Sequence, residues 1–156
     1  MSQLYQNKKV ILFELNEETY GVSIDHVVSI ERPQAITRVP HVQAYVKGIM
    51  TMRGLMIPVI DMHKRFNMAE SLETTEERII IVEMDDIMVG LFVDSAHHVV
   101  DLSPSQIEDA PDIVGGLEAA YIDGIARYEE DKLLVLLNLK QVLTTNEVND
   151  LKKIEA

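Results

Sequence analysis

The chain has 156 residues, of which 47% are apolar and only 5% aromatic, so its core must be built mainly from aliphatic side chains and methionine. Its 26 acidic residues against 14 lysines and arginines give a formal charge of −12, which disfavours binding to nucleic acid or to an anionic membrane surface. The absence of cysteine excludes disulfides, zinc thiolates and thiol catalysis, and it fits a cytoplasmic protein.

Short strand-like segments recur along the whole chain. Those rich in β-branched or aliphatic residues are 10–15, 20–24, 48–52, 55–60, 78–84, 88–93, 121–128 and 133–137. Many short strands with few helices predict a mostly β fold of small barrels or sandwiches. No apolar run approaches the ~20 residues of a membrane helix, and the first residues, MSQLYQNKK, lack the apolar core of a secretory signal.

Helix signals are few and brief. Asp61 and Asn138 are each placed to cap a short helical turn. Thr144 and Glu147 match a capping box, and apolar residues follow them at helical spacing. We therefore predict a C-terminal helix over about 145–155.

A weak internal repeat relates the two halves of the chain. The segment YGVSIDHVVSI (20–30) resembles VGLFVDSAHHVVDL (89–102). Four landmark pairs keep the same order, namely Gly21 with Gly90, Asp25 with Asp94, Gly48 with Gly124, and Asp61 with Asn138. The repeat indicates two related β-units, which should share an apolar interface with a binding groove between them.

No arrangement of residues in the sequence predicts an enzyme or a metal site. His97 and His98 are neighbours, whose side chains point to opposite faces of a strand, and the histidines show no HxH or HExxH spacing. The acidic pair Asp85-Asp86 falls at a predicted turn, where solvation explains it. We expect no catalytic residues, no metal and no cofactor.

The segment GIMTMRGLMIPVIDM (48–62) contains an Arg-Gly pair between two apolar stretches. Arg53 and Gly54 predict a tight hairpin turn, since glycine readily adopts positive φ. Arg53 either forms a structural ion pair with an acidic residue or contacts a partner. The segment's methionines either fill the core or line an adaptable groove for a partner helix; they are Met50, Met52, Met56 and Met62.

The same segment resembles the G[VI]xNLRGxxxPVxDL signature of the CheW family, the coupling proteins of bacterial chemotaxis. The matching residues are Gly48-Ile49, Arg53-Gly54 and Pro58-Val59-Ile60-Asp61. Supporting segments are LFELNEETYGVSIDHVVSI (12–30), TRVP (37–40), VGLFVDSAHHVVDLSPSQIEDAP (89–111) and YIDGIARYEEDKLLVLLNLKQVL (121–143). The resemblance covers about residues 8–145.

The resemblance implies a single CheW-like domain over residues 1–156, in which two five-stranded SH3-like β-barrels surround a shared core. We expect the first barrel at about 15–77. The second is expected at about 78–145, joined by the strand 8–14.

The resemblance also implies a non-enzymatic adaptor in the cytoplasm. It would couple the cytoplasmic tips of chemoreceptors to the histidine kinase CheA, binding the CheW-like regulatory domain of that kinase without entering the membrane. Carried over by motif, the receptor-binding groove would include Val27, Gly48, Arg53 and Val99, and the kinase contacts Ile30 and Ile36. The family often has Glu where this chain has Ser29, and Glu31 follows on the same strand face.

Two other functions remain open at the level of the sequence. One is that of a CheW paralogue in a chemosensory pathway whose output is not motility. The other is that of a small-molecule-binding β-domain, which a pocket with a few convergent polar groups would favour.

Overall fold

The structure, a computed structural model, describes residues 7–69, 75–109, 113–114, 117–129 and 131–155. The first half contains β1 (Lys8–Leu15), β2 (Glu18–Ser23), the 3₁₀ turn η2 (Ile24–His26), β3 (Val27–Glu31), β4 (Val46–Met52), β5 (Leu55–Asp61) and α1 (Met62–Arg65). The second contains β6 (Arg78–Met84), β7 (Ile87–Val93), β8 (Ser95–Leu102), η3 (Pro104–Gln106), β9 (Ile107–Glu108), β10 (Ile113–Val114), β11 (Leu117–Glu118), η4 (Ala119–Tyr121), β12 (Ile122–Glu129), β13 (Lys132–Leu137), α2 (Leu139–Val142) and α3 (Thr145–Glu155).

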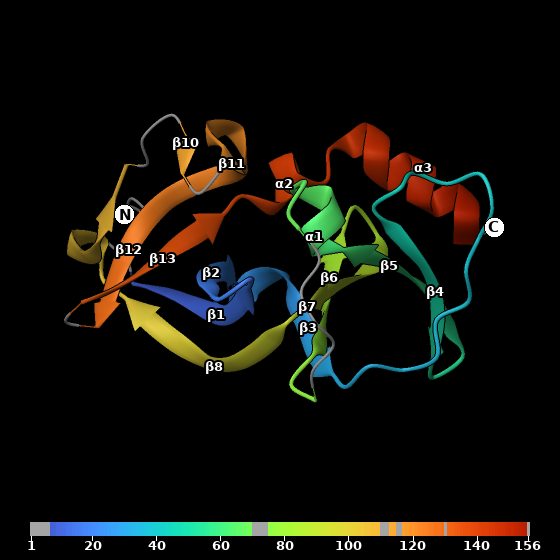
Figure 1. The fold of residues 1–156 in the computed structure, drawn as a ribbon, viewed down its shortest axis with the longest axis horizontal. Coiled ribbons are helices and arrows are strands. Elements are labelled where there is room, and N and C mark those ends of the chain that lie inside the picture. Colours follow the sequence, from blue (N-terminus) through green and yellow to red (C-terminus); the bar gives the residue numbers. More distant parts are fainter. Residues whose placement is uncertain (1–6, 70–74, 110–112, 115–116, 130, 156) are drawn as a thin grey trace.

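Two sheets lie side by side, one at each end of the molecule (Figure 1). The first has six strands in the order β8-β1-β2-β13-β12-β9, and the second has five in the order β3-β6-β7-β5-β4. A two-stranded sheet, β10-β11, accompanies the first. The predicted mostly β fold in two units is confirmed, as is the C-terminal helix, which is α3.

The division of the chain between the sheets differs from the predicted boundaries. The strands β6 and β7, expected in the second barrel, pair with β3, β4 and β5, while β2, expected in the first, pairs with β1 and β13. The five-stranded sheet therefore takes its strands from β3 to β7, and the six-stranded sheet takes β1 and β2 together with β8, β9, β12 and β13. The predicted boundary near residue 77 followed the sequence repeat, but β2 pairs with β13, and β6 and β7 pair with β3 and β5.

The pairing registers reproduce the repeat. Gly21 of β2 lies opposite Leu136 of the parallel strand β13, and its repeat partner Gly90 of β7 lies opposite Val59 of the parallel strand β5. Chain segments also cross close to Gly48 and Gly124, where an added Cβ would meet a backbone carbonyl oxygen at 2.3 and 2.9 Å. The two sheets thus share the same arrangement of paired strands.

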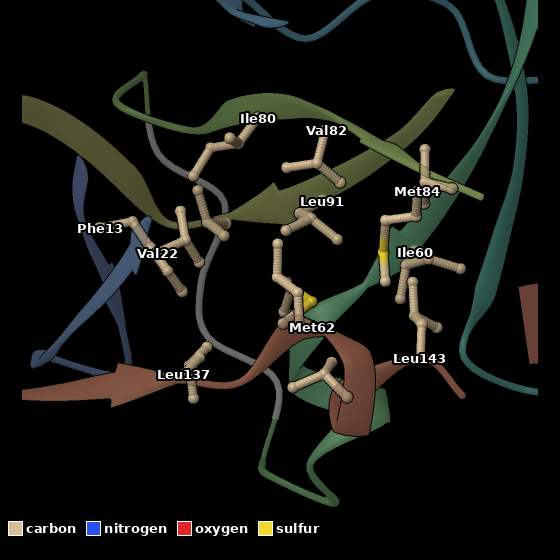
Figure 2. Close-up of a cluster of buried hydrophobic side chains, with 14 of the residues drawn as sticks. Phe13, Val22, Ile60, Met62, Ile80, Val82, Met84, Leu91, Leu137 and Leu143 are labelled. Carbon is tan, nitrogen blue, oxygen red and sulfur yellow. The ribbon is translucent and has the colours of Figure 1, made fainter. Parts of the chain in front are cut away.

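A shared core joins the two sheets. Phe13, Val22 and Leu137 extend from the six-stranded sheet towards Ile80 and Leu91 of the five-stranded sheet (Figure 2). Along β1 and β6, alternate side chains enter this shared core, and the residues between them enter a second core inside their own sheet. Burial on both faces explains why these strands read as continuous apolar runs.

Arg65, at the end of α1, connects this helix to α2 and α3. Its Nε donates to the Val142 carbonyl at 2.7 Å, and its guanidinium pairs with Glu147 of α3 at 3.0 Å. The same guanidinium lies over the rings of Tyr45 and Tyr121, at 5.0 and 5.4 Å from their centroids. Glu147 also accepts from the backbone N–H of Thr144, so the predicted capping box forms.

Candidate partner-binding site

The β4–β5 hairpin presents Arg53 at its tip. Arg53 and Gly54 have φ values of +53° and +80°, which are the conformations of a two-residue hairpin turn. The Arg53 side chain is exposed, and its guanidinium forms no hydrogen bond or ion pair with the residues that the structure describes. The structural ion pair considered for Arg53 is therefore not formed within that part of the chain.

Leu55 and Met56 follow Arg53 and are also exposed, at 50% and 48%. As consecutive residues of β5 they point to opposite faces of the strand, so the hairpin tip exposes one apolar side chain on each face next to the arginine. The other methionines of the segment, Met50, Met52 and Met62, are at most 9% exposed and fill the core. Sequence reasoning did not single out Leu55, although its place immediately after the turn is the available signal.

Gly48 is a buried position in the middle of β4, where its φ is +150°. The segment before β4 crosses it closely: Thr37 and Ile49 exchange two backbone hydrogen bonds of 2.8 Å. A Cβ at position 48 would lie 2.3 Å from the Thr37 oxygen and 2.7 Å from the Ile36 side chain. The glycine is thus required by local packing, whether or not a partner touches this strand.

The strand β3 exposes one row of apolar side chains. Val28 and Ile30 are 47% and 37% exposed, whereas Val27 is half-buried and packs against the shared core. Because side chains alternate along a strand, Val27 and Ile30 lie on opposite faces. Since β3 is the end strand of its sheet, its outer edge is not paired with a described strand. Val28 was not among the predicted site residues.

Ser29 and Glu31 share the half-buried face of β3 with Val27. The Ser29 hydroxyl is buried and makes no hydrogen bond with the described residues. The sequence expectation that Ser29 and Glu31 point the same way is therefore met. Position 29 therefore carries a neutral hydroxyl where the family commonly has the charged carboxylate of Glu.

Val99 lies on β8, opposite Ile11, and is 48% exposed. Because β8 is the end strand of the six-stranded sheet, Val99 and Val27 occupy equivalent edges of the two units. Ile36 is instead half-buried and packs on the core inside the five-stranded sheet. The predicted residues thus divide into exposed ones, Arg53, Ile30 and Val99, and packed ones, Gly48, Val27 and Ile36.

A buried polar cluster, which the sequence did not predict, lies at the junction of the two sheets. His63 lies between two carboxylates: its Nε2 is 3.1 Å from Asp94, and its Nδ1 is 3.6 Å from Asp61. Asp61 also caps α1, and Asp94 accepts a hydrogen bond from the backbone N–H of Asn16. The two carboxylates thus stabilise the first turn of α1 and the β1–β2 turn, which is a structural role.

Among the described residues, no group of three potential ligands is arranged to hold a metal ion. In the same part of the chain, no helix is long and apolar enough to cross a membrane.

Comparison with known proteins identifies the family. The family profile described as "CheW-like domain" matches residues 9–147. The chain belongs to the CheW-like domain family. It is 39% identical over 142 residues to "Chemotaxis protein CheW" of Bacillus subtilis (strain 168), covering 91% of this chain and 90% of that protein. It is also 30% identical over 150 residues to "Chemotaxis protein CheW" of Treponema pallidum (strain Nichols), covering 94% and 88%.

A solved CheW structure has the same fold. The crystal structure of "scaffolding protein TtCheW" from Thermoanaerobacter tengcongensis superposes with a TM-score of 0.82 at 34% identity, covering 91% of this chain and 96% of that one. The resemblance first seen in the signature around Arg53 therefore extends through both sheets. The paired units with a shared core belong to the CheW-like fold.

Proposed function

We propose that this CheW-like chain is a non-enzymatic adaptor of bacterial chemotaxis, which couples the cytoplasmic tips of chemoreceptors to the histidine kinase CheA. It would act in the cytoplasm and reach the membrane only through these partners. The observation that carries the proposal is the β4–β5 hairpin of the family signature. It holds an exposed guanidinium, unengaged by the described residues, beside the exposed side chains of Leu55 and Met56.

The receptor tip is proposed to contact Arg53, Val27 and Val99, with Gly48 shaping the strand behind the hairpin. Arginine beside apolar surface is a residue combination enriched at binding hot spots. Val99 and Val27 lie on the end strands of the two sheets. A single helix of the receptor that lies along the boundary between the two sheets would therefore contact both of them.

The kinase is proposed to bind the outward face of β3 through Ile30, with its exposed neighbour Val28, while Ile36 supports this region from within. Val27 and Ile30 face opposite ways on the same strand. That arrangement allows receptor and kinase to be held at the same time without competing for one surface.

The substitution Arg53→Glu tests the receptor contact. It should weaken capture of a receptor cytoplasmic fragment at least about tenfold, because it replaces a donor fork by an acid in a chain of charge −12. Thermal unfolding should change little. The matched control is Arg127→Glu, an equal charge change at an exposed position on β12. Equal losses in both variants, or a large drop in melting temperature for Arg53→Glu alone, would count against the contact.

Whether the output is motility is a separate question that a deletion strain answers on swarm plates. Loss of spreading supports the chemotaxis role. Normal spreading assigns the protein to a chemosensory pathway with another output, in which the same adaptor chemistry would operate.

A further inference from the structure

A basic cavity lies beside the irregular segment between β3 and β4. It has a volume of about 480 Å³ and lies between that segment, the start of β4 and α1. Its walls combine apolar side chains with the cations Arg38, Lys47 and Lys64 and the imidazole of His41. Volumes of this size are typical of sites for small molecules.

The charge of this cavity is opposite to that of the whole chain. The protein carries 26 acidic residues against 14 lysines and arginines, yet Arg38, Lys47 and Lys64 line the cavity together, and no acid is among the described residues that line it. Like charges placed around one concavity repel one another, and a concave wall focuses their field on the space they enclose. An anion in that space would relieve the repulsion.

Two of the cations are not neutralised within the described chain. Neither Arg38 nor Lys47 has a carboxylate within ion-pair distance among the residues that the structure describes. Elsewhere cations such as Arg65 and Lys132 do have such partners. The Lys47 ammonium lies 4.6 Å from the centroid of the Phe92 ring, a cation–π contact that restrains it near the strand.

We propose that this cavity binds a small multiply charged oxyanion, of the class of organic phosphates and polycarboxylates. Arg38 supplies a planar fork of N–H donors, and Lys47 and Lys64 supply point charges. The apolar walls, including Ile36 and Val46, accept a carbon skeleton attached to the anionic group. The cavity shares the wall residue Ile36 with the proposed kinase-binding region, but none of its three cations belongs to the proposed partner contacts, so charge reversal at the cations tests the anion site separately.

The test uses the full chain and titrates it with sodium pyrophosphate and, separately, with citrate, while backbone amide shifts are followed by NMR. Sodium chloride at matched ionic strength gives the non-specific baseline. We expect saturable shifts around residues 36–47, with a Kd of about 1 mM or tighter. Stronger binding of pyrophosphate identifies the phosphate class, and stronger binding of citrate identifies the carboxylate class.

Charge reversal then locates the site. Arg38→Glu and Lys47→Glu should each weaken binding at least about tenfold, whereas Lys9→Glu, an exposed lysine on β1, should change it less than about twofold. Should Lys47→Glu fail to fold, Lys47→Gln removes the same charge. Absence of saturation, identical shifts with chloride, or equal binding by all variants would overturn the proposal.

Discussion

Replacing Gly48 by alanine should destabilise the fold because the structure has no room for a Cβ there. The added atom would lie 2.3 Å from the Thr37 oxygen at a residue whose φ is +150°. A non-glycine residue in such a backbone conformation costs about 1–3 kcal/mol. Moving the crossing segment away also breaks the two hydrogen bonds between Thr37 and Ile49, each worth about 0.5–1.5 kcal/mol.

The sum is about 4 kcal/mol, a large part of the roughly 5–15 kcal/mol that stabilises a typical domain. For a chain of this length it lowers the melting temperature by about 8–16 °C. The control is Gly54→Ala, since φ is +80° there but nothing lies within 4 Å of the added Cβ, so only about 1 kcal/mol is expected.

Urea unfolding followed by circular dichroism measures both variants. Gly48→Ala should have the lower midpoint, and any loss of partner binding should follow from unfolding. If Gly48→Ala unfolds no earlier than Gly54→Ala yet loses receptor binding, Gly48 is a contact residue and the steric reasoning is wrong.

Two further predictions concern the helices. Arg65→Met should lower the free energy of unfolding by about 2–4 kcal/mol, because it leaves the Val142 carbonyl without its Nε donor and the Glu147 carboxylate without its cation. Lys153→Met, which removes only an exposed pair at 3.8 Å, should change it by less than about 1 kcal/mol in the same urea titration, and equal effects would contradict the assignment. Burial and the neighbouring Glu147 raise the pKa of Tyr45 to about 12, so between pH 10 and 12 the folded chain keeps a proton that the unfolded chain loses. The free energy of unfolding should therefore fall across that range, and less steeply in Tyr45→Phe; equal slopes would refute the role of Tyr45.

The sequence was sufficient for the features that local chemistry determines. Arg53-Gly54 predicted the hairpin turn, Thr144 and Glu147 predicted the start of α3, and the repeat predicted two related units. Each depends on residues close together in the chain, where backbone preference and hydrogen bonding are decided locally.

Long-range pairing could not be read in the same way. The strands β2 and β13 lie more than a hundred residues apart in sequence, and their alternation of side chains does not say which strand will be the neighbour. The same applies to His63, which becomes part of a cluster only when Asp94 is brought beside it. The solvent exposure of individual methionines could not be predicted from the sequence either. Met50 and Met56 lie in the same apolar segment, yet Met50 fills the core and Met56 faces solvent.

The adaptor role is tested most directly by reconstituting receptor fragment, CheA kinase and this chain, and measuring kinase autophosphorylation with each component omitted in turn. We expect the receptor fragment to change kinase activity only when this chain is present, with the change reduced by Arg53→Glu and preserved by Arg127→Glu. An equal receptor effect without this chain, or with Arg53→Glu, would rule out the adaptor role.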